Sequence, residues 1–561
     1  MKKLNIPVGI SDFAKIRDRN YYYVDKTNLI SDLLEEETAE VTLITRPRRF
    51  GKTMAMSMLA HFFDIRKDSK AMFQGLKIAE NTELCDEWMN QWPVLCLSFR
   101  RVDGLNFQGA YGMLQATITD VCENHLYLLD SPQVSAYPKE VMDRLLRGTA
   151  SEKETKGSLL MLTKMMEAHY GKPVILLIDE YDVPIAKASA NGYYDEMLDV
   201  MKGILQALKD NDALRFAVIT GCLRIAKESI FTGTNNFVSD TISSSHLNEY
   251  FGFTQEEVDQ ILIDADQTDH AEDVKAWYDG YHFGELDVYC PWDVMNYLRD
   301  LQKNPKTKPA SYWKNTSDNA IIRSFIDYTN AKISQKLETL LDGGYIVQQI
   351  EENLTYDYLH SSEENLWSIL YFTGYLTQAR EEDLPEALSE DETALMIPNA
   401  EIRQIFATTV KKWFSDSAKG WNRAAVFRAM WSGDAETLTD EINDLLYKTI
   451  SYHDYKEYFY HAFLAGILAG TGCAVKSNRE HGEGRSDVVV YNMEKRQVAI
   501  FEAKYAKTLD DLEASCDAAL QQIEDRQYAK DFADDYDDIL CYGIAFYKKR
   551  CLVRTMQGGA L

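Results

Sequence analysis

Four short apolar runs, separated by helical patterns, organise the first 250 residues. Val41–Thr45 is rich in β-branched residues and is followed at once by a loop and a helical pattern. Residues 174–178 form a continuous apolar run, as expected of a strand that is covered on both faces. Residues 93–98 and 215–220 are two further strand candidates. This alternation predicts an α/β domain with a doubly wound sheet over residues 1–252.

The pattern changes at about Phe253. Short helical runs with many aromatic residues and few strand signals continue to about residue 435, interrupted by an acidic loop at 381–385. We interpret residues 253–435 as a helical middle region.

A third pattern follows the middle region. Leu438, Ile442 and Leu445 recur at helical spacing. The elements expected after them are a helix, two strands, a second helix and a last strand, at residues 457–470, 487–490, 498–501, 512–520 and near 544. That order predicts a small α+β domain over residues 436–561.

The net charge restricts the partners that the chain can have. Its 561 residues carry a formal net charge of -28. Because neutralised phosphates supply most of the affinity for nucleic acid, the chain as a whole should be repelled by DNA or RNA. Contact with nucleic acid therefore requires a local basic patch. The alternative is that the acidity only keeps the protein soluble.

Neither a membrane nor an oxidising compartment is indicated. No apolar run approaches the roughly 18 residues of a membrane span, and no apolar segment follows the amino-terminal lysines. The nine cysteines are scattered without a C-x-x-C pair, which indicates neither a disulfide framework nor a zinc site. We expect a cytoplasmic protein with no membrane partner, for which a homo-oligomer is an open option.

A glycine–lysine–threonine triplet follows the first expected strand. Gly51, Lys52 and Thr53 supply the second half of the G-x4-G-K-[ST] pattern, and Arg46 occupies the place of its first glycine. In this pattern the loop N–H groups and the lysine hold phosphates, and the hydroxyl binds Mg²⁺. The loop predicts a nucleotide site that comprises Arg46, Arg48, Arg49, Phe50, Gly51, Lys52 and Thr53.

Two acids extend this site. Asp179 and Glu180 come directly after the apolar run at 174–178. An aspartate at the end of a strand can hold Mg²⁺, and the next glutamate can orient or deprotonate the attacking water. Thr220 ends the following strand, where a sensor of the γ-phosphate would stand. The alternatives are an acidic cap and an ordinary strand-terminal threonine. We predict binding and hydrolysis of ATP with Mg²⁺, with Thr53 and Asp179 as metal ligands and Glu180 as the catalytic base.

Six motifs between residues 7 and 399 are specific in combination. They are Pro-Val-Gly-Ile at 7–10 with Phe13, Tyr-Val-Asp-Lys-Thr at 23–27, the loop at 46–53, Asp-Glu-Tyr-Asp at 179–182, Trp-Tyr-Asp-Gly-Tyr at 277–281 and Ile-Pro-Asn at 397–399. Together they resemble the bacterial AAA-ATPase-like family. The resemblance implies an AAA-type P-loop region followed by a PD-(D/E)XK domain of restriction-endonuclease-like fold. It also implies that an arginine-rich loop without the first glycine is usual.

A second acidic constellation lies in the carboxyl-terminal domain. Asp487 precedes Glu502-Ala503-Lys504, and each group begins or ends a strand-like segment. A hairpin would bring Asp487 beside Glu502, and residues at i and i+2 share one strand face. A PD-(D/E)XK site requires two carboxylates on Mg²⁺ and a lysine close to the attacking water. We predict Asp487 and Glu502 as metal ligands, and both with Lys504 as catalytic residues.

Neighbouring residues add to this site. Glu457 is expected to add a carboxylate with His461 one turn on, unless the two are a solvated helix pair. Gln522 and Tyr528 resemble a glutamine signature that supports many such nucleases. Several basic residues are candidates for a local patch or are plain solubilising charge: Lys476, Arg479, Arg485, Lys495, Arg496, Lys548, Lys549 and Arg550.

Three functions are compatible with these patterns. The first is an ATP-regulated, metal-dependent nuclease that acts on DNA or RNA, which the complete set of Asp487, Glu502 and Lys504 favours. The second is a nucleotide-switched interaction module whose nuclease-like domain binds without cleaving, which the net acidity favours. The third is an ATPase scaffold whose carboxyl-terminal domain only assembles oligomers.

Overall fold

The chain divides into two compact units. The computed structural model describes residues 3–35, 39–224, 237–313, 336–337, 339–352, 363–385, 388–389, 391–417, 423–449, 457–469, 473–481 and 484–556. Unit 1 comprises Met1–Thr316 and Val347–Glu401, and unit 2 comprises Ser317–Ile346 and Ile402–Leu561. The expected domain borders at residues 252 and 435 stay a prediction. No helix of the described residues has the length and apolar character that crossing a membrane requires.

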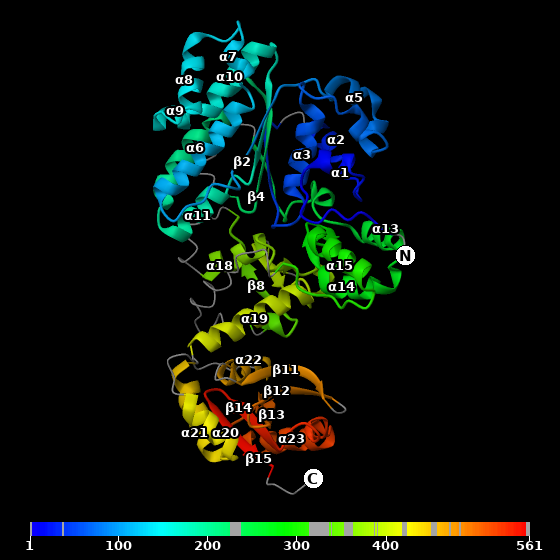
Figure 1. The fold of residues 1–561 in the computed structure, drawn as a ribbon, viewed down its shortest axis with the longest axis vertical. Helices are drawn as coiled ribbons and strands as arrows, with labels where there is room; N and C mark the ends of the chain where they lie inside the picture. The colour runs from blue at the N-terminus through cyan, green and yellow to red at the C-terminus, as the bar shows by residue number, and fades with distance from the viewer. Residues whose placement is uncertain are drawn as a thin grey trace. The chain divides into compact units, whose positions relative to one another are not determined.

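Unit 1 is built on a five-stranded parallel sheet (Figure 1). Its strands lie in the order β2-β3-β4-β1-β5, with bounds β1 (Val41–Thr45), β2 (Val94–Ser98), β3 (Val174–Asp179), β4 (Leu214–Gly221) and β5 (Phe237–Asp240). The first four confirm the expected strands. β5 was missed because its four residues mix apolar and polar side chains. Since all five strands are parallel, their carboxyl ends meet at one edge of the sheet.

Helices cover both faces of this sheet. Helix α3 (Lys52–Phe63) lies on one face, and α6 (Phe107–Glu123) and α10 (Ser158–Tyr170) lie on the other (Figure 1). Strands β1 and β3 are buried along their whole length, which is why their sequences are apolar runs. The other helices of this part are α1 (Phe13–Asp18), α2 (Leu29–Glu35), α4 (Lys70–Phe73), α5 (Thr82–Trp88), α7 (Tyr127–Asp130), α8 (Ala136–Leu146), α9 (Glu152–Lys156), α11 (Val183–Asn191) and α12 (Tyr194–Ile204). The predicted doubly wound P-loop-type fold is confirmed.

The rest of unit 1 is mainly helical but also contains short strands. Its helices are α13 (Gln255–Ala265), α14 (Ala271–Tyr278), α15 (Pro291–Lys303) and α18 (Glu363–Phe372). The first three form a core against which Leu4, Tyr22 and Val24 of the amino-terminal segment pack. The strands are β6 (Tyr281–Phe283), β7 (Leu286–Val288), β9 (Thr377–Gln378), β10 (Glu392–Met396) and β8 (Tyr345–Gln349), whose first two residues are assigned to unit 2. The sequence pattern did not predict them because such short strands leave little room for a two-residue alternation.

Unit 2 holds a mixed five-stranded sheet. Its strands follow their order in the chain, as β11 (Ala474–His481), β12 (Gly484–Asn492), β13 (Gln497–Tyr505), β14 (Asp538–Tyr547) and β15 (Arg550–Thr555). Only β13 and β14 are parallel neighbours. The accompanying helices are α19 (Ala400–Ser417), α20 (Arg423–Ser432), α21 (Ala435–Thr449), α22 (Glu457–Leu468) and α23 (Leu512–Asp525). This mixed sheet confirms the predicted α+β fold.

Two helices cover opposite faces of the unit 2 sheet. Tyr460 of α22 stacks on Phe546, with 4.5 Å between the ring centroids. Cys516 of α23 packs against Ala545, the neighbouring residue of the same strand. Because successive strand residues point to opposite faces, α22 and α23 lie on different sides of β14.

Candidate nucleotide and nuclease sites

Three of the predicted residues meet at the carboxyl edge of the unit 1 sheet. Asp179 ends β3 and is buried, with 3% of its surface exposed. The hydroxyl of Thr53, in the first turn of α3, donates to Asp179 Oδ2 at 2.9 Å. The hydroxyl of Thr220, next to the end of β4, donates to Asp179 Oδ1 at 2.7 Å. The edge therefore holds a buried carboxylate between two hydroxyl groups, a set of hard oxygen ligands that fits Mg²⁺.

Lys52 begins α3 and is also buried, with 6% exposed. Its Nζ donates to the carbonyl oxygens of Arg46 and Pro47 at 2.7 and 2.8 Å, and Cys222 Sγ lies 3.8 Å away. Among the residues that the structure describes, no carboxylate forms an ion pair with this ammonium group. The amino end of a helix adds a further partial positive charge. A buried cation at this position, whose hydrogen-bond partners are all neutral, fits a phosphate as a counter-charge.

Glu180 follows Asp179 in a left-handed backbone conformation with a φ of 54°. Its side chain is half-buried, and burial together with the Asp179 carboxylate raises the pKa of Glu180 above its usual range. A higher pKa brings a carboxylate closer to the pH at which general bases work best. The next acid, Asp182, accepts from the backbone N–H groups of Cys222 and Leu223 at 3.0 and 3.1 Å. Asp182 therefore supports the chain after β4, and Glu180 is the better-placed base.

Other side chains of the loop point into the rest of unit 1. Phe50 is fully buried, and its ring lies 4.9 Å from that of Tyr281 and 5.1 Å from that of Phe283. The Arg49 guanidinium stacks over Trp292 at 4.0 Å. Arg48 is exposed. Phe50 thus anchors the loop to the β6–β7 hairpin and does not point toward the sheet edge that holds Asp179.

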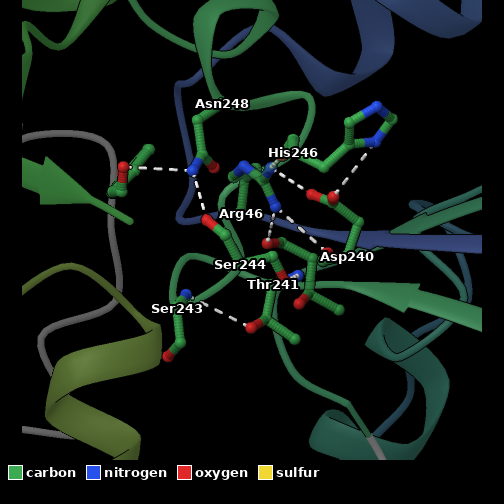
Figure 2. Close-up of polar contacts among 9 residues, drawn as sticks. Arg46, Asp240, Thr241, Ser243, Ser244, His246 and Asn248 are labelled. Atoms are coloured by element: carbon green, nitrogen blue, oxygen red, sulfur yellow. Dashed lines mark hydrogen bonds and ion pairs between the residues drawn. The ribbon is translucent and has the colours of Figure 1, made fainter. Parts of the chain in front are cut away.

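Arg46 has a partner that the sequence did not reveal (Figure 2). Its guanidinium is fully buried and forms an ion pair with Asp240, the last residue of β5. The same group donates to the backbone oxygens of Thr45, Asp240 and His246 at 2.9, 3.0 and 3.3 Å. The Arg46 side chain is therefore not proposed as a phosphate ligand. The only sequence signal for Asp240 is an acid at the end of an unpredicted strand.

The second predicted site lies on the β12–β13 hairpin of unit 2. Val488 pairs with Phe501, so the same register places Asp487 opposite Glu502. The Asp487 Oδ2 atom accepts from the Ala503 N–H at 2.8 Å. Lys504 Nζ lies 3.3 Å from Glu502 Oε1, in keeping with residues i and i+2 on one strand face. The hairpin therefore brings the two acids and the lysine together.

Glu502 is the buried member of this group. It is 2% exposed, and its Oε2 has no hydrogen-bond partner among the described residues. Burial and the nearby Asp487 carboxylate raise the pKa of Glu502 to about 7. No group of three or more His, Cys, Asp or Glu in the described part of the chain is arranged to hold a metal. Two carboxylates, one with an unused buried oxygen, fit Mg²⁺, because this ion usually binds one or two carboxylates and keeps several waters.

Supporting residues surround Glu502 and Asp487. Gln522 of α23 donates to Glu502 Oε1 and lies 3.4 Å from the Tyr528 hydroxyl. His461 Nδ1 of α22 lies 3.9 Å from Asp487 Oδ1. The predicted contribution of the Glu457 side chain falls outside the part of the chain that the structure describes.

The expected basic patch is only partly described. The side chains of Arg479 and Arg485 lie outside the described residues. Arg496 pairs with Asp537 at 3.1 Å. Arg554, which is not one of the expected patch residues, pairs with Glu513 at 3.0 Å and also with Asp517. These two arginines are therefore compensated by acids, and a patch that binds nucleic acid stays a prediction.

Comparison with known proteins covers both sites. Residues 7–231 match a family model described as "Predicted AAA-ATPase", and residues 455–556 match the PD-(D/E)XK nuclease superfamily. A protein of Azotobacter chroococcum mcd 1, described as "Uncharacterized protein in vnfD 5'region", is 23% identical over 563 residues, which cover 97% of each chain. The first match includes Lys52, Thr53 and Asp179, and the second includes Asp487 and Glu502. The chain therefore combines an AAA-ATPase-like region at residues 7–231 with a domain of the PD-(D/E)XK nuclease superfamily at residues 455–556.

Proposed function

We propose that this protein binds and hydrolyses ATP and that its carboxyl-terminal domain is a metal-dependent nuclease that acts on nucleic acid. The ATP half of the proposal rests on Lys52, the first residue of α3. Its buried ammonium has only neutral hydrogen-bond partners among the described residues. A phosphate at this helix end would compensate both the ammonium group and the unpaired N–H groups of the first turn.

The residues around Asp179 have separate roles in this proposal. The N–H groups near Gly51 and the Lys52 ammonium hold the β- and γ-phosphates, and Thr53 and Asp179 hold Mg²⁺. Thr220 keeps the Asp179 carboxylate in place through its 2.7 Å hydrogen bond, which fits the expected role of a sensor of the γ-phosphate. Glu180 orients the attacking water and takes its proton.

The nuclease half rests on the acids and the lysine of the β12–β13 hairpin. Asp487 and Glu502 hold Mg²⁺, which when bound would supply charge stabilisation to a phosphodiester and lower the pKa of a bound water. Gln522 fixes the Glu502 carboxylate from α23. Lys504, 3.3 Å from Glu502, is placed to orient the attacking water and to offset negative charge that develops on the phosphate.

The two halves are tested separately on the purified full-length chain. Calorimetric titration with ATP and Mg²⁺ should show saturable binding, and its absence would reject the ATP half. Incubation with single- and double-stranded DNA and RNA should show cleavage that needs Mg²⁺ and stops on chelation. Asp487→Asn should abolish that cleavage. Asp517→Asn, which removes an exposed acid of α23 that pairs with Arg554, is the matched control and should cleave normally.

A nucleotide-switched module that binds without cleaving is the second candidate. The net charge of -28 favours it, as do the acid partners of Arg496 and Arg554. Under this alternative the wild-type protein binds ATP but cleaves none of the substrates with any divalent metal.

A further inference from the structure

The side chain of Arg46 stands at the first position of the phosphate loop. Where the G-x4-G-K-[ST] pattern has a glycine, Arg46 places a fully buried guanidinium between the ends of β1 and β5. Four of its hydrogen bonds stay inside the protein, two with Asp240 and one each with the carbonyl oxygens of Thr45 and His246 (Figure 2). The Phe251 ring lies 5.3 Å from the same group. Arg46 therefore fixes the base of the loop, where glycine would leave it free to bend.

The backbone of Arg46 continues this anchor toward the nucleotide site. Its N–H donates to the Gly221 carbonyl at 3.1 Å, next to Thr220. Its own carbonyl accepts from Lys52 Nζ at 2.7 Å. A continuous series of contacts thus runs from the Asp240 carboxylate through Arg46 to the ammonium of Lys52.

Asp240 is itself held firmly. It lies opposite Ile44 in the pairing of β5 with β1 and is 3% exposed. The turn after it closes on itself, because Thr241 N–H donates to Ser244 Oγ at 2.9 Å (Figure 2). Asn248 then donates to the Phe283 carbonyl at 3.0 Å, which joins the turn to the β6–β7 hairpin. The acid that holds Arg46 is therefore fixed from two sides.

We propose that Asp240 and Arg46 are positioning residues of the nucleotide site, and that their ion pair sets the position of Lys52. This assignment rests on the proposed ATP binding. It also implies that restoring the consensus glycine at position 46 harms the site, because the buried Asp240 carboxylate would lose the guanidinium that compensates its charge. If the ion pair had a purely structural role, replacing both charged residues by apolar ones would restore stability and ATP binding together.

The test compares ATP affinity with thermal stability in the full-length chain. Arg46→Gly should weaken ATP binding more than tenfold. The double variant Arg46→Met, Asp240→Leu should melt within a few degrees of the wild type and still bind ATP more than tenfold more weakly. The control replaces a pair at the far end of α3: Arg66→Met with Asp64→Leu removes a 2.9 Å ion pair and should leave ATP affinity unchanged.

Each outcome decides between the roles. Wild-type affinity in the double variant would overturn the positioning role while leaving the proposed ATP binding intact. Absence of ATP binding by the wild type would instead reject the proposed function itself. If the double variant does not fold, Arg46→Lys tests the positioning role, because this variant keeps the charge but loses the forked guanidinium. We expect native melting and intermediate ATP affinity for Arg46→Lys, and unchanged affinity would overturn the proposal.

Discussion

Replacing Lys52 by methionine should separate stability from nucleotide affinity. The change keeps most of the side-chain length and removes a buried ammonium that has only neutral partners among the described residues. Burying an ion costs several kcal/mol of free energy, whereas each hydrogen bond of a charged group returns about 1.5–3 kcal/mol. These contributions oppose each other, so the free energy of unfolding of the nucleotide-free protein should change by no more than about 2 kcal/mol.

Affinity for ATP should respond much more strongly. Loss of one charge-assisted contact with the phosphates costs about 1.5–3 kcal/mol, which corresponds to a roughly 10- to 150-fold weaker Kd. At an ATP concentration about 100 times the wild-type Kd, ATP stabilises the wild type by about 2.7 kcal/mol. The same concentration should stabilise Lys52→Met by only about 0.3–1.4 kcal/mol.

Thermal melting with and without ATP and Mg²⁺, together with calorimetric titration, measures both effects. The control is Lys172→Met, because Lys172 Nζ also donates to a backbone carbonyl, that of Gln91, at 3.0 Å. Lys172 precedes β3 and therefore lies at the opposite edge of the sheet from Asp179. A Lys52→Met protein that keeps the full ATP-dependent shift would refute the assignment of this loop as the phosphate site.

Two further predictions concern individual acids. Glu180→Gln should lower the rate of ATP hydrolysis by about 10²–10⁴ and leave the Kd for ATP unchanged; phosphate release at the wild-type rate would exclude Glu180 as the base. Asp293 is 1% exposed, and burial with the neighbouring Glu401 carboxyl raises the pKa of Asp293 well above its usual value of 3.8. The folded protein thus retains a proton that the unfolded chain releases above about pH 4. The free energy of unfolding therefore falls as the pH rises from about 4 toward the pKa that Asp293 has in the folded protein. Asp293→Asn should therefore raise the melting temperature at pH 8 and reduce its decline between pH 5 and pH 8, as followed by circular dichroism; an unchanged decline would contradict this reasoning.

The sequence predicted elements whose pattern is local. The runs at 41–45 and 174–178 were identifiable because strands buried on both faces are continuously apolar. The spacing within Glu502-Ala503-Lys504 was sufficient to predict a shared face, since side chains alternate along a strand. In both cases the chemistry depends on residues a few positions apart.

Contacts between distant segments were not predictable in this way. Arg46 lies almost two hundred positions from Asp240, and nothing in either local sequence indicates that the two pair. The loop at 46–53 suggested phosphate contacts for Phe50, whereas the structure packs its ring on the hairpin at 281–283. Residues that take part in long-range packing therefore need the fold before their roles can be assigned.

The central claim is that one chain carries an ATP site and a separate nuclease site, and one matched experiment tests it most directly. ATP hydrolysis and Mg²⁺-dependent cleavage of nucleic acid are measured in parallel for the wild type, Lys504→Ala and Lys52→Ala. We predict that Lys504→Ala loses cleavage and keeps ATP hydrolysis, because its side chain lies at the proposed nuclease site, 3.3 Å from Glu502. Lys52→Ala should lose ATP hydrolysis and, if ATP regulates the nuclease, cleave more slowly than the wild type. A wild-type protein that fails to hydrolyse ATP, or that cleaves no nucleic acid with Mg²⁺, would contradict the account.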